Sequence, residues 1–329
     1  MKVYISFHFD LNSFGGGNNF LKYLKKHLNK KGFSVDRVKR ADIIIINSHH
    51  QIFYNLYLKF RFPSKLFIHR IDGKLSNHRN KIYWDELIKI QNKFISNATI
   101  YQSNWSKRLW EGDLKSPISE VIINEADPDL FKSNTRKHLS GRINLIFVSW
   151  SDNKNKGSEY LEWVIKEKEN YNLSLRIIGN LEVKNKKDSK YAVKHNEMQN
   201  LYKQSDIFLF PAKNEACSNA LVEAQACGLP VLALNSGGNP ELILDSGETF
   251  NDVQEMISGL NKIIKNYDDY SLAALKITNN RKSVQHYEEF IKSLLLNNQH
   301  INKVSKIKLI YASALILKLK IQIFIDYLK

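Results

Sequence analysis

The chain of 329 residues has only two cysteines and no long apolar run. Cys217 and Cys227 match no metal-ligating or redox spacing, so we expect neither a disulfide framework nor a cysteine metal site. No stretch reaches the roughly 18 consecutive apolar residues that a membrane-spanning helix needs. The first ten residues turn polar too quickly for a signal peptide. These absences predict a reduced, cytoplasmic protein.

Acidic residues are also scarce, with 33 Asp and Glu against 49 Lys and Arg, a net charge of +16. Residues 1–140 hold 24 basic and 12 acidic residues, and residues 281–329 hold nine and three. Residues 141–280 are slightly acidic, with 16 basic and 18 acidic residues. A basic first part and a basic tail favour contact with an anionic surface, either nucleic acid or lipid headgroups. Lysine-rich solvated faces explain the same charge equally well.

Apolar β-type runs alternate with helical spacing in two blocks of the sequence. In the first block these runs are residues 3–7, 41–47, 66–68, 98–101 and 120–123. In the second they are residues 144–148, 173–178, 206–210 and 230–233, with helical segments at 157–169, 196–204 and 218–227. Such alternation predicts two doubly wound α/β domains.

The expected domain boundaries follow from these blocks. We assign residues 1–137 to a first domain, joined by the helical tail 283–329, and residues 138–282 to a second. In doubly wound sheets, ligands bind beyond the carboxyl ends of the strands, where the strand order reverses. The sequence therefore predicts a ligand site in a cleft between two facing sheets.

Two loops have the composition of a phosphate site. The first contains Gly16 and Gly17, before a helix whose N-terminal N–H groups are free to bind an anion. It departs from the G-x-G-x-x-G pattern, so a flexible turn is an equal interpretation. The second loop places Lys154 and Lys156 after the first strand of the second block, within reach of a diphosphate. A solvated loop is the alternative there.

The strongest motif runs from residue 208 to residue 231 as strand, loop, helix and strand. Ser218 is a favourable N-cap for the helix. Glu215 stands before this helix and Glu223 lies inside it, so two carboxylates address two ends of one elongated ligand. Small apolar residues surround Glu223 in the sequence, which argues against a solvated side chain because a buried acid without a partner is costly.

These residues resemble the donor-site signature of the retaining glycosyltransferases of family 4, the glycosyl transferases group 1. The signature comprises the two glutamates, the run Ala-Cys-Gly-Leu-Pro-Val at 226–231, and Ser-Gly-Gly-Asn-Pro-Glu-Leu-Ile at 236–243. The resemblance extends to Lys156-Gly157, to residues 124–131 and to Gly16-Gly17, and it covers roughly residues 1–290. It implies an α/β protein of the GT-B fold, with two Rossmann-like doubly wound domains facing across a cleft and a helical C-terminal tail.

The resemblance also implies roles for the donor site. Glu215 would hold hydroxyls of the donor sugar, and Glu223 would hold the ribose hydroxyls of the nucleotide. Lys156, with Lys154, would neutralise the diphosphate, because Ser151 stands where many members have an arginine. Backbone groups around Ser218, Asn219 and Gly16 would complete the phosphate site.

Members of this family often carry a histidine near the donor sugar in the first domain. Asp72 is the leading candidate for that place here, since it follows an apolar run and precedes a glycine. His69 is the second candidate, and His49 and His50 compete with both. A structural role is an open interpretation for each histidine.

The function implied by the resemblance is metal-independent, retaining transfer of a sugar from a nucleoside-diphosphate sugar, with UDP or GDP expected and no cofactor. The acceptor would be a glycan or lipid-linked glycan in surface polysaccharide or lipopolysaccharide biosynthesis. The alternative is a non-catalytic protein that binds nucleotide sugars or nucleic acid on the same fold. We expect no nucleic-acid partner, because the basic residues form no recognisable module.

Two segments have the composition of an interfacial membrane contact. Residues 52–65 mix aromatics with Lys and Arg, and residues 303–320 are apolar and basic without acids. Ordinary helix packing explains the first segment equally well. With the basic first domain, these segments predict peripheral association with an anionic membrane at the inner face of the plasma membrane.

Overall fold

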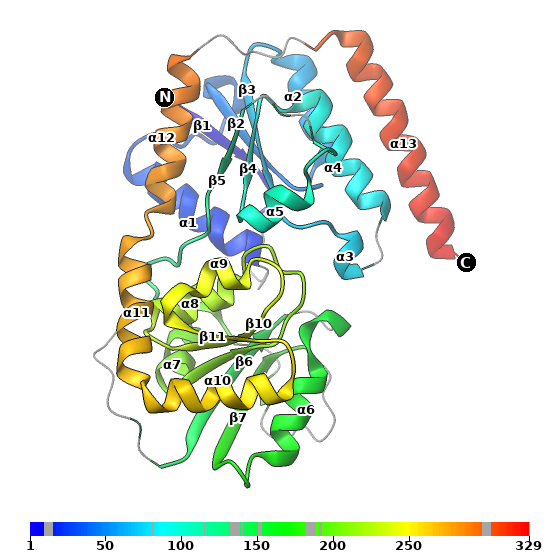
Figure 1. Ribbon diagram of the computed structural model, residues 1–329. Helices are drawn as coiled ribbons and strands as arrows, with labels where there is room; N and C mark the ends of the chain where they lie inside the picture. Colours follow the sequence, from blue (N-terminus) through cyan, green and yellow to red (C-terminus); the bar gives the residue numbers. More distant parts are fainter. Residues whose placement is uncertain are drawn as a thin grey trace. The chain divides into compact units, whose positions relative to one another are not determined.

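The chain folds into two compact units of parallel β-sheet and helices (Figure 1). The first comprises Met1–Leu11, Leu21–Ile122 and Val284–Lys329, and the second comprises Asn12–Phe20 and Ile123–Ser283. The computed structural model describes residues 1–9, 16–79, 82–114, 116, 118–131, 139, 141–150, 153–181, 189–190, 193–297 and 304–328.

The division of the chain after Ile122 lies earlier than the boundary at residue 137 that the sequence pattern predicts. Its physical reason is the packing of the segment that follows. Ile123 and Leu130 pack against the core of the second unit, and Phe131 is buried within that core. The apolar side chains of this segment therefore belong to the second unit.

The first unit is built on a five-stranded parallel sheet in the order β1-β2-β3-β4-β5. Its strands are β1 (Val3–Ser6), β2 (Ile43–Asn47), β3 (Leu66–Ile71), β4 (Ala98–Tyr101) and β5 (Ser119–Val121). Its helices are α1 (Gly16–Lys30), η1 (Val38–Arg40), α2 (Ile52–Arg61), α3 (Ser76–Arg79), α4 (Ile82–Ile95), α5 (Asn104–Leu109), α12 (Ser283–Leu296) and α13 (Lys306–Leu328). The first residues of α1, up to Phe20, and Ser283 of α12 belong to the second unit.

Helices cover both faces of this sheet, as the continuous run of β-branched residues in β2 predicts (Figure 1). Ile44 and Ile46 of β2 share a core cluster with residues of α2 and α4. On the other face, His27 of α1 lies 3.1 Å from Glu288 of α12. The predicted doubly wound architecture is confirmed for this unit.

The C-terminal tail is helical, as predicted, and its last helix packs on the first unit. Leu309, Ala312 and Ile316 of α13 are buried in the cluster formed with α2 and α4. These residues lie on one face of the helix, since they are spaced three and four apart. Within the described residues, no helix combines the length and the hydropathy that crossing a membrane requires.

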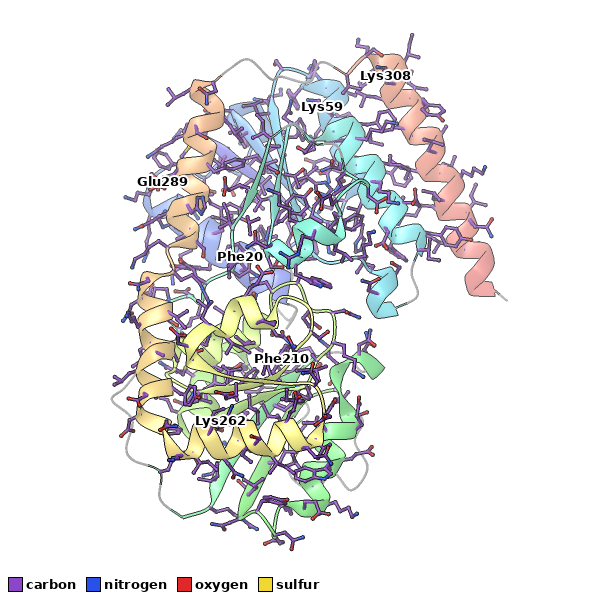
Figure 2. The ribbon with its side chains drawn as sticks, viewed as in Figure 1. Phe20, Lys59, Phe210, Lys262, Glu289 and Lys308 are labelled. Atoms are coloured by element: carbon purple, nitrogen blue, oxygen red, sulfur yellow. The ribbon has the colours of Figure 1, made fainter. Side chains whose placement is uncertain are left out.

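A lysine is buried in the core of the first unit. The side chain of Lys59 on α2 is 0% exposed (Figure 2). Its Nζ donates to Asn97 Oδ1 at 3.4 Å and lies 4.9 Å from the centre of the Phe67 ring. Burial lowers the pKa of Lys59 to about 8, because an ammonium group loses hydration in an apolar core.

The second unit is built on a six-stranded parallel sheet in the order β11-β10-β9-β6-β7-β8. Its strands are β6 (Ile143–Ser149), β7 (Leu173–Gly179), β8 (Ser189–Lys190), β9 (Ile207–Phe210), β10 (Val231–Leu234) and β11 (Gly247–Phe250). Its helices are η2 (Lys154–Lys156), α6 (Ser158–Glu167), η3 (His195–Glu197), α7 (Met198–Lys203), α8 (Asn219–Ala226), α9 (Asn239–Ile243), η4 (Leu244–Ser246), α10 (Val253–Lys265) and α11 (Tyr267–Asn280).

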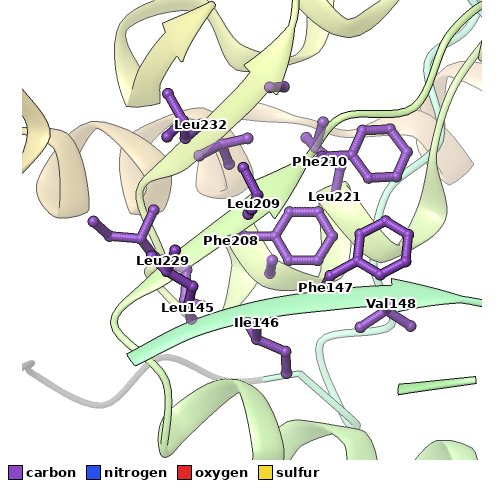
Figure 3. Packing of buried hydrophobic residues seen from close by; sticks show 14 of the residues in the cluster. Leu145, Ile146, Phe147, Val148, Phe208, Leu209, Phe210, Leu221, Leu229 and Leu232 are labelled. Carbon is purple, nitrogen blue, oxygen red and sulfur yellow. The ribbon is translucent and has the colours of Figure 1, made fainter. Parts of the chain in front are cut away.

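The centre of this sheet is strongly apolar. Phe208 and Phe210 of β9 stack with ring centres 5.7 Å apart, and Phe147 of the neighbouring β6 belongs to the same cluster (Figure 3). All three phenylalanines are at most 2% exposed. The loops that follow β6 and β9 therefore start from strands anchored in this apolar core.

Candidate functional site

The strand order of the second sheet reverses between β6 and β9. The chain proceeds from β6 outward through β7 and β8, then returns to β9 on the other side of β6. The loops that leave the carboxyl ends of such a strand pair diverge, and ligands bind between them. Here these loops carry Lys156, which follows β6, and Glu215, which follows β9.

Lys156 and Glu215 form an ion pair between Nζ and Oε1. Their side chains are 15% and 23% exposed, so the pair is largely but not completely shielded from water. The family resemblance implies donor-site roles for both residues but does not predict that they contact each other. The structure brings together a cation and a carboxylate from two loops that are about 60 residues apart in the chain.

Gly157 fixes the loop that carries Lys156. Its φ is +72°, and a Cβ at this position would lie 2.3 Å from the carbonyl oxygen of Pro211 in the loop after β9. The amide of Lys213 donates to the carbonyl of Asn155 at 2.7 Å, which ties the same two loops together. Only glycine fits this close approach in a left-handed conformation. The packing of the two loops therefore requires a glycine directly after Lys156.

Gly237 fixes the backbone of Glu215 in a similar way. The amide of Gly238 donates to the carbonyl of Glu215 at 2.7 Å, and Ser236 Oγ accepts from the amide of Asn214 at 3.0 Å. The φ of Gly237 is +66°, and a Cβ there would lie 2.4 Å from the carbonyl oxygen of Glu215. The Ser-Gly-Gly segment therefore holds Glu215 in place.

We expect Gly237→Ala to lower the stability of the fold by more than the cost of a left-handed alanine alone. The matched control is Gly32→Ala, because Gly32 has φ +69° but no atom within 4 Å of the place that a Cβ would take. A left-handed alanine costs about 1–2 kcal/mol by itself, and the clash with Glu215 should add roughly 2 kcal/mol at Gly237. Thermal unfolding of both variants measures the difference. Equal losses of stability would show that Gly237 does not hold Glu215.

The helix α8 begins beside these loops as predicted. Ser218 is its N-cap, and Ser218 Oγ accepts from the amide of Leu221 at 3.3 Å. Asn219, the first residue of the helix, accepts a hydrogen bond from Asn124 Nδ2 at 2.7 Å through its side-chain oxygen. The amides at the start of α8 carry the positive end of the helix dipole, which favours an anion.

Glu223 is buried inside α8, and it has partners. Its side chain is 10% exposed and accepts from His195 Nε2 at 2.9 Å. Tyr202 donates its hydroxyl to the other carboxylate oxygen at 3.4 Å. Burial and the neighbouring carboxylate raise the pKa of Tyr202 well above its ordinary value, so its hydroxyl stays protonated and keeps donating. The expectation that Glu223 is not a solvated side chain is confirmed.

His195 and Tyr202 were not identified from the sequence. His195 lies in η3 and Tyr202 in α7, 28 and 21 residues before Glu223. Neither sits in a motif or a spacing that indicates a carboxylate partner. The requirement that a buried acid has a partner predicted that such residues exist, but not which ones.

Three further residues predicted to bind phosphate, Gly16, Gly17 and Lys154, lie at or near the start of a helix. Gly16 and Gly17 begin α1, so their amides belong to the first turn of a helix, as expected from the sequence. Lys154 lies in η2, one turn before the left-handed Gly157. Ser151, where many family members have arginine, lies outside the described residues.

Asp72 follows β3, as predicted, and its carboxylate is 42% exposed. Arg70 Nη1 lies 3.7 Å from Asp72 Oδ1, and the guanidinium is itself buried. The carbonyl of Asp72 accepts from Trp110 Nε1 at 2.8 Å. A fixed backbone therefore presents this carboxylate at the end of the strand.

His69 lies in the interior of β3 and is 0% exposed. Its Nε2 donates to the carbonyl of Ser48 at 2.8 Å. Burial lowers the pKa of His69 to about 4, so the ring is neutral at pH 7. His69 therefore packs inside the sheet. Of the two leading candidates in the first domain, Asp72 and His69, only Asp72 has an accessible side chain.

The competing candidates His49 and His50 follow β2. Their rings stack with centres 4.5 Å apart, and His49 also packs edge-on against Trp84 at 4.4 Å. His50 contacts Phe7, which follows β1, at 5.2 Å. Both histidines thus sit at the carboxyl end of the first sheet, as Asp72 does. In the described part of the chain, no group of three or more His, Cys, Asp or Glu side chains lies close enough to hold a metal ion.

Comparison with known proteins agrees with this architecture. Residues 133–307 match the family described as glycosyl transferases group 1. An uncharacterized glycosyltransferase of Haemophilus influenzae is 26% identical over 209 residues, which are 56% of this chain and 58% of that protein. An uncharacterized 41.2 kDa protein in the cps region of Klebsiella pneumoniae is 33% identical over 121 residues, 35% of this chain and 34% of that protein. The matches thus span between a third and somewhat over half of these relatives.

Solved structures show the same fold. Sucrose-phosphate synthase of Thermosynechococcus elongatus has a TM-score of 0.72 at 12% identity, covering 89% of this chain and 98% of that chain. The Anabaena protein HepE in complex with UDP-glucose has a TM-score of 0.67 at 14% identity, covering 89% and 98%. The predicted GT-B architecture of two Rossmann-like doubly wound domains with a helical C-terminal region is confirmed.

Proposed function

Because the chain belongs to the glycosyl transferases group 1 family, we propose that it transfers a sugar from a nucleoside-diphosphate sugar, with retention of configuration, to a glycan or lipid-linked glycan. The observation that carries this proposal is the meeting of Lys156 and Glu215 at the strand reversal of the second sheet. The start of α8 and the buried carboxylate of Glu223 lie in the same unit. These groups match the parts of an elongated donor.

Each part of the donor has a chemical counterpart in this unit. The diphosphate needs positive charge, which Lys156 and the amides at the start of α8 supply. The sugar and ribose carry adjacent hydroxyls, for which carboxylates are suitable acceptors. We assign Glu215 to the sugar because it forms an ion pair with Lys156, and Glu223 to the ribose because it lies farther along, inside α8.

Breaking the bond between sugar and phosphate leaves negative charge on the departing diphosphate and positive charge on the sugar. Lys156 and the helix dipole stabilise the first charge without having to reorganise during the reaction. The carboxylate of Glu215 is suited to stabilise the second. We propose that the acceptor attacks from the face that the diphosphate leaves, which retains configuration and requires no protein nucleophile.

The acceptor and the cellular place are proposed from the relatives and from charge. One relative, 33% identical over 72 residues (21% of this chain, 19% of that protein), is an Escherichia coli galactosyltransferase whose acceptor is linked to diphosphoundecaprenol. A lipid-linked acceptor suits a chain whose first 140 residues are strongly basic. We therefore propose that the protein acts in surface polysaccharide or lipopolysaccharide biosynthesis at the inner membrane face, and without a metal or other cofactor.

The experiment that tests the donor class is a thermal-shift panel of UDP-, GDP- and ADP-sugars. A donor that binds only the folded protein raises the melting temperature, and saturation at about 100 times Kd stabilises the fold by about 2.7 kcal/mol. Incubation of that donor with a mixture of acceptors should then release free nucleoside diphosphate. Stabilisation by random oligonucleotides instead, without release of nucleotide, would favour the non-catalytic alternative.

Glu223→Gln tests the assignment of the ribose site. The amide keeps the volume but has a single acceptor oxygen, so the donor KM should rise roughly tenfold while kcat changes little, because the ribose is remote from the reacting bond. Steady-state kinetics with varied donor measure both constants. The melting temperature without donor controls for loss of the bonds from His195 and Tyr202. A large fall in kcat with unchanged KM would contradict the assignment.

A further inference from the structure

The last helix of the first unit has a second apolar face that the fold does not bury. Leu309, Ala312 and Ile316 pack inward. The outer face of α13 consists of Ile307, Ile310, Ala314, Leu317, Ile321 and Phe324. Five of these side chains are exposed large hydrophobics, from 51% for Ile321 to 79% for Ile307.

The spacing of the outer face is regular. Its residues are alternately three and four apart along 18 positions, so they form one stripe along the helix. A soluble helix usually turns charged residues away from its core, whereas this one turns apolar residues outward. An exposed apolar stripe of this length indicates a surface that contacts another apolar phase.

The neighbouring helix continues this surface. Phe53, Tyr54, Tyr57 and Phe60 of α2 are between 40% and 57% exposed. Lys306, at the start of α13, has its Nζ 5.2 Å from the centre of the Phe60 ring, which places Phe60, the last of these aromatics, beside the start of α13. Aromatic side chains are enriched where proteins meet the boundary between lipid headgroups and acyl chains.

The charges that border this surface are positive. Lys308 and Lys318 are exposed on α13 (Figure 2 labels Lys308), and Lys320 lies with its Nζ 4.9 Å from the Trp84 ring. The sequence of α13 contains one acid, Asp326, near its end. Lysines beside an apolar stripe extend their ammonium groups toward lipid phosphates while their stems stay in the apolar layer.

We propose that the outer face of α13, with the exposed aromatics of α2, is the surface by which the first unit docks on an anionic lipid bilayer. The helix lies in the interface and does not cross it. A second copy of the chain fits less well, because two such helices would bring lysines together without acids to pair with them. The reason for such docking, a lipid-linked acceptor in the membrane, rests on the proposed function.

Vesicle binding of matched variants tests the surface. Leu317→Glu places a charge in the stripe, and Leu272→Glu on α11 makes the same change at a leucine that is 64% exposed outside it. With vesicles of phosphatidylcholine and phosphatidylglycerol, Leu317→Glu should lower the bound fraction about tenfold, and Leu272→Glu should not change it. Ile321→Glu serves as a second variant, and far-ultraviolet circular dichroism shows that the helices persist.

A second pair tests the charges. Lys318→Gln should weaken binding to anionic vesicles and reduce its dependence on salt, whereas Lys276→Gln, four residues after Leu272 on α11, should leave both unchanged. Equal binding by Leu317→Glu and Leu272→Glu would overturn the proposal. So would a dimer of the wild-type protein that Leu317→Glu converts to a monomer without any effect on vesicle binding.

These measurements use no sugar nucleotide. A protein that binds donor in the thermal-shift panel but does not bind vesicles would overturn the docking surface and leave the transferase function standing. A protein that binds vesicles through the outer face of α13 but responds to no sugar nucleotide would overturn the transferase function alone.

Discussion

Glu215→Gln should lower kcat for sugar transfer about a thousandfold while leaving the fold intact. In the structure the carboxylate is the ionic partner of Lys156. When a donor is bound, Lys156 is expected to face the diphosphate, and Glu215 is then free to stabilise the charge that develops on the sugar. The amide retains hydrogen bonding but not the negative charge, so the loss falls on the transition state.

The affinity for the donor should also change in a characteristic way in Glu215→Gln. Without the carboxylate, Lys156 has lost its ionic partner before the donor arrives, so the diphosphate should bind at least as tightly as in the wild type. We therefore expect a lower kcat with an unchanged or lower donor KM. Steady-state kinetics and the thermal shift with donor measure the two quantities separately.

The matched control is Glu159→Gln. Glu159 also forms an ion pair in the second unit, with Lys213 at 3.0 Å, but both side chains are about half exposed, at 52% and 43%. An exposed pair of this kind contributes little to stability, and Glu159 is not assigned to the donor. Its kinetics should match the wild type. Equal turnover by Glu215→Gln would remove Glu215 from the mechanism.

The two sheets could be predicted from the sequence because their strands are short apolar runs bounded by polar loops. β11 was missed, since Gly247 at its start and the half-exposed residues after it do not resemble a buried strand. A Cβ on Gly247 would lie 1.8 Å from the carbonyl of Val231 on the adjacent β10, so the glycine is required by strand packing. Such a requirement depends on the neighbouring strand and leaves no local pattern.

The candidate site was predictable where the chemistry is local. Ser218 caps its helix through a bond to an amide three residues later, so sequence spacing alone identifies it. The partnership of Lys156 with Glu215, and of Glu223 with His195, depends on which strands are neighbours. His69 illustrates the opposite case: the family resemblance made it a candidate for the histidine near the donor sugar, yet it is fully buried in the sheet.

Lys59→Met should stabilise the first unit by about 3 kcal/mol at pH 7. The pKa of Lys59 in the folded protein is about 8, against an ordinary value of 10.5, and each unit corresponds to about 1.4 kcal/mol. At pH 7 the lysine is charged in both states, so the folded state bears the full cost of burying the ammonium. Methionine keeps an unbranched apolar side chain against Phe67 without that charge.

In the Lys59→Met variant the acceptor of the lost hydrogen bond, Asn97 Oδ1, still has a second donor. Asn97 Oδ1, which accepts from Lys59 at 3.4 Å, also accepts from the amide of Phe67 at 2.9 Å and keeps that bond in the variant. The shorter bond is the stronger of the two, since 3.4 Å is at the long limit for such contacts. The substitution therefore removes a desolvated charge at the cost of one weak hydrogen bond and a cation–π contact.

The dependence on pH distinguishes this cause from better packing. Between pH 8 and pH 10.5 the unfolded chain binds more protons at Lys59 than the folded chain does, so the wild type gains stability as the pH rises through this window. The variant lacks that gain, and its advantage should shrink toward zero near pH 10.5. Hydrogen–deuterium exchange of α2 and β3 at pH 7 and pH 10 measures the stability of this unit, with Lys276→Met on α11 as the exposed control. An advantage that stays constant with pH would show that the ammonium group of Lys59 carries no burial penalty.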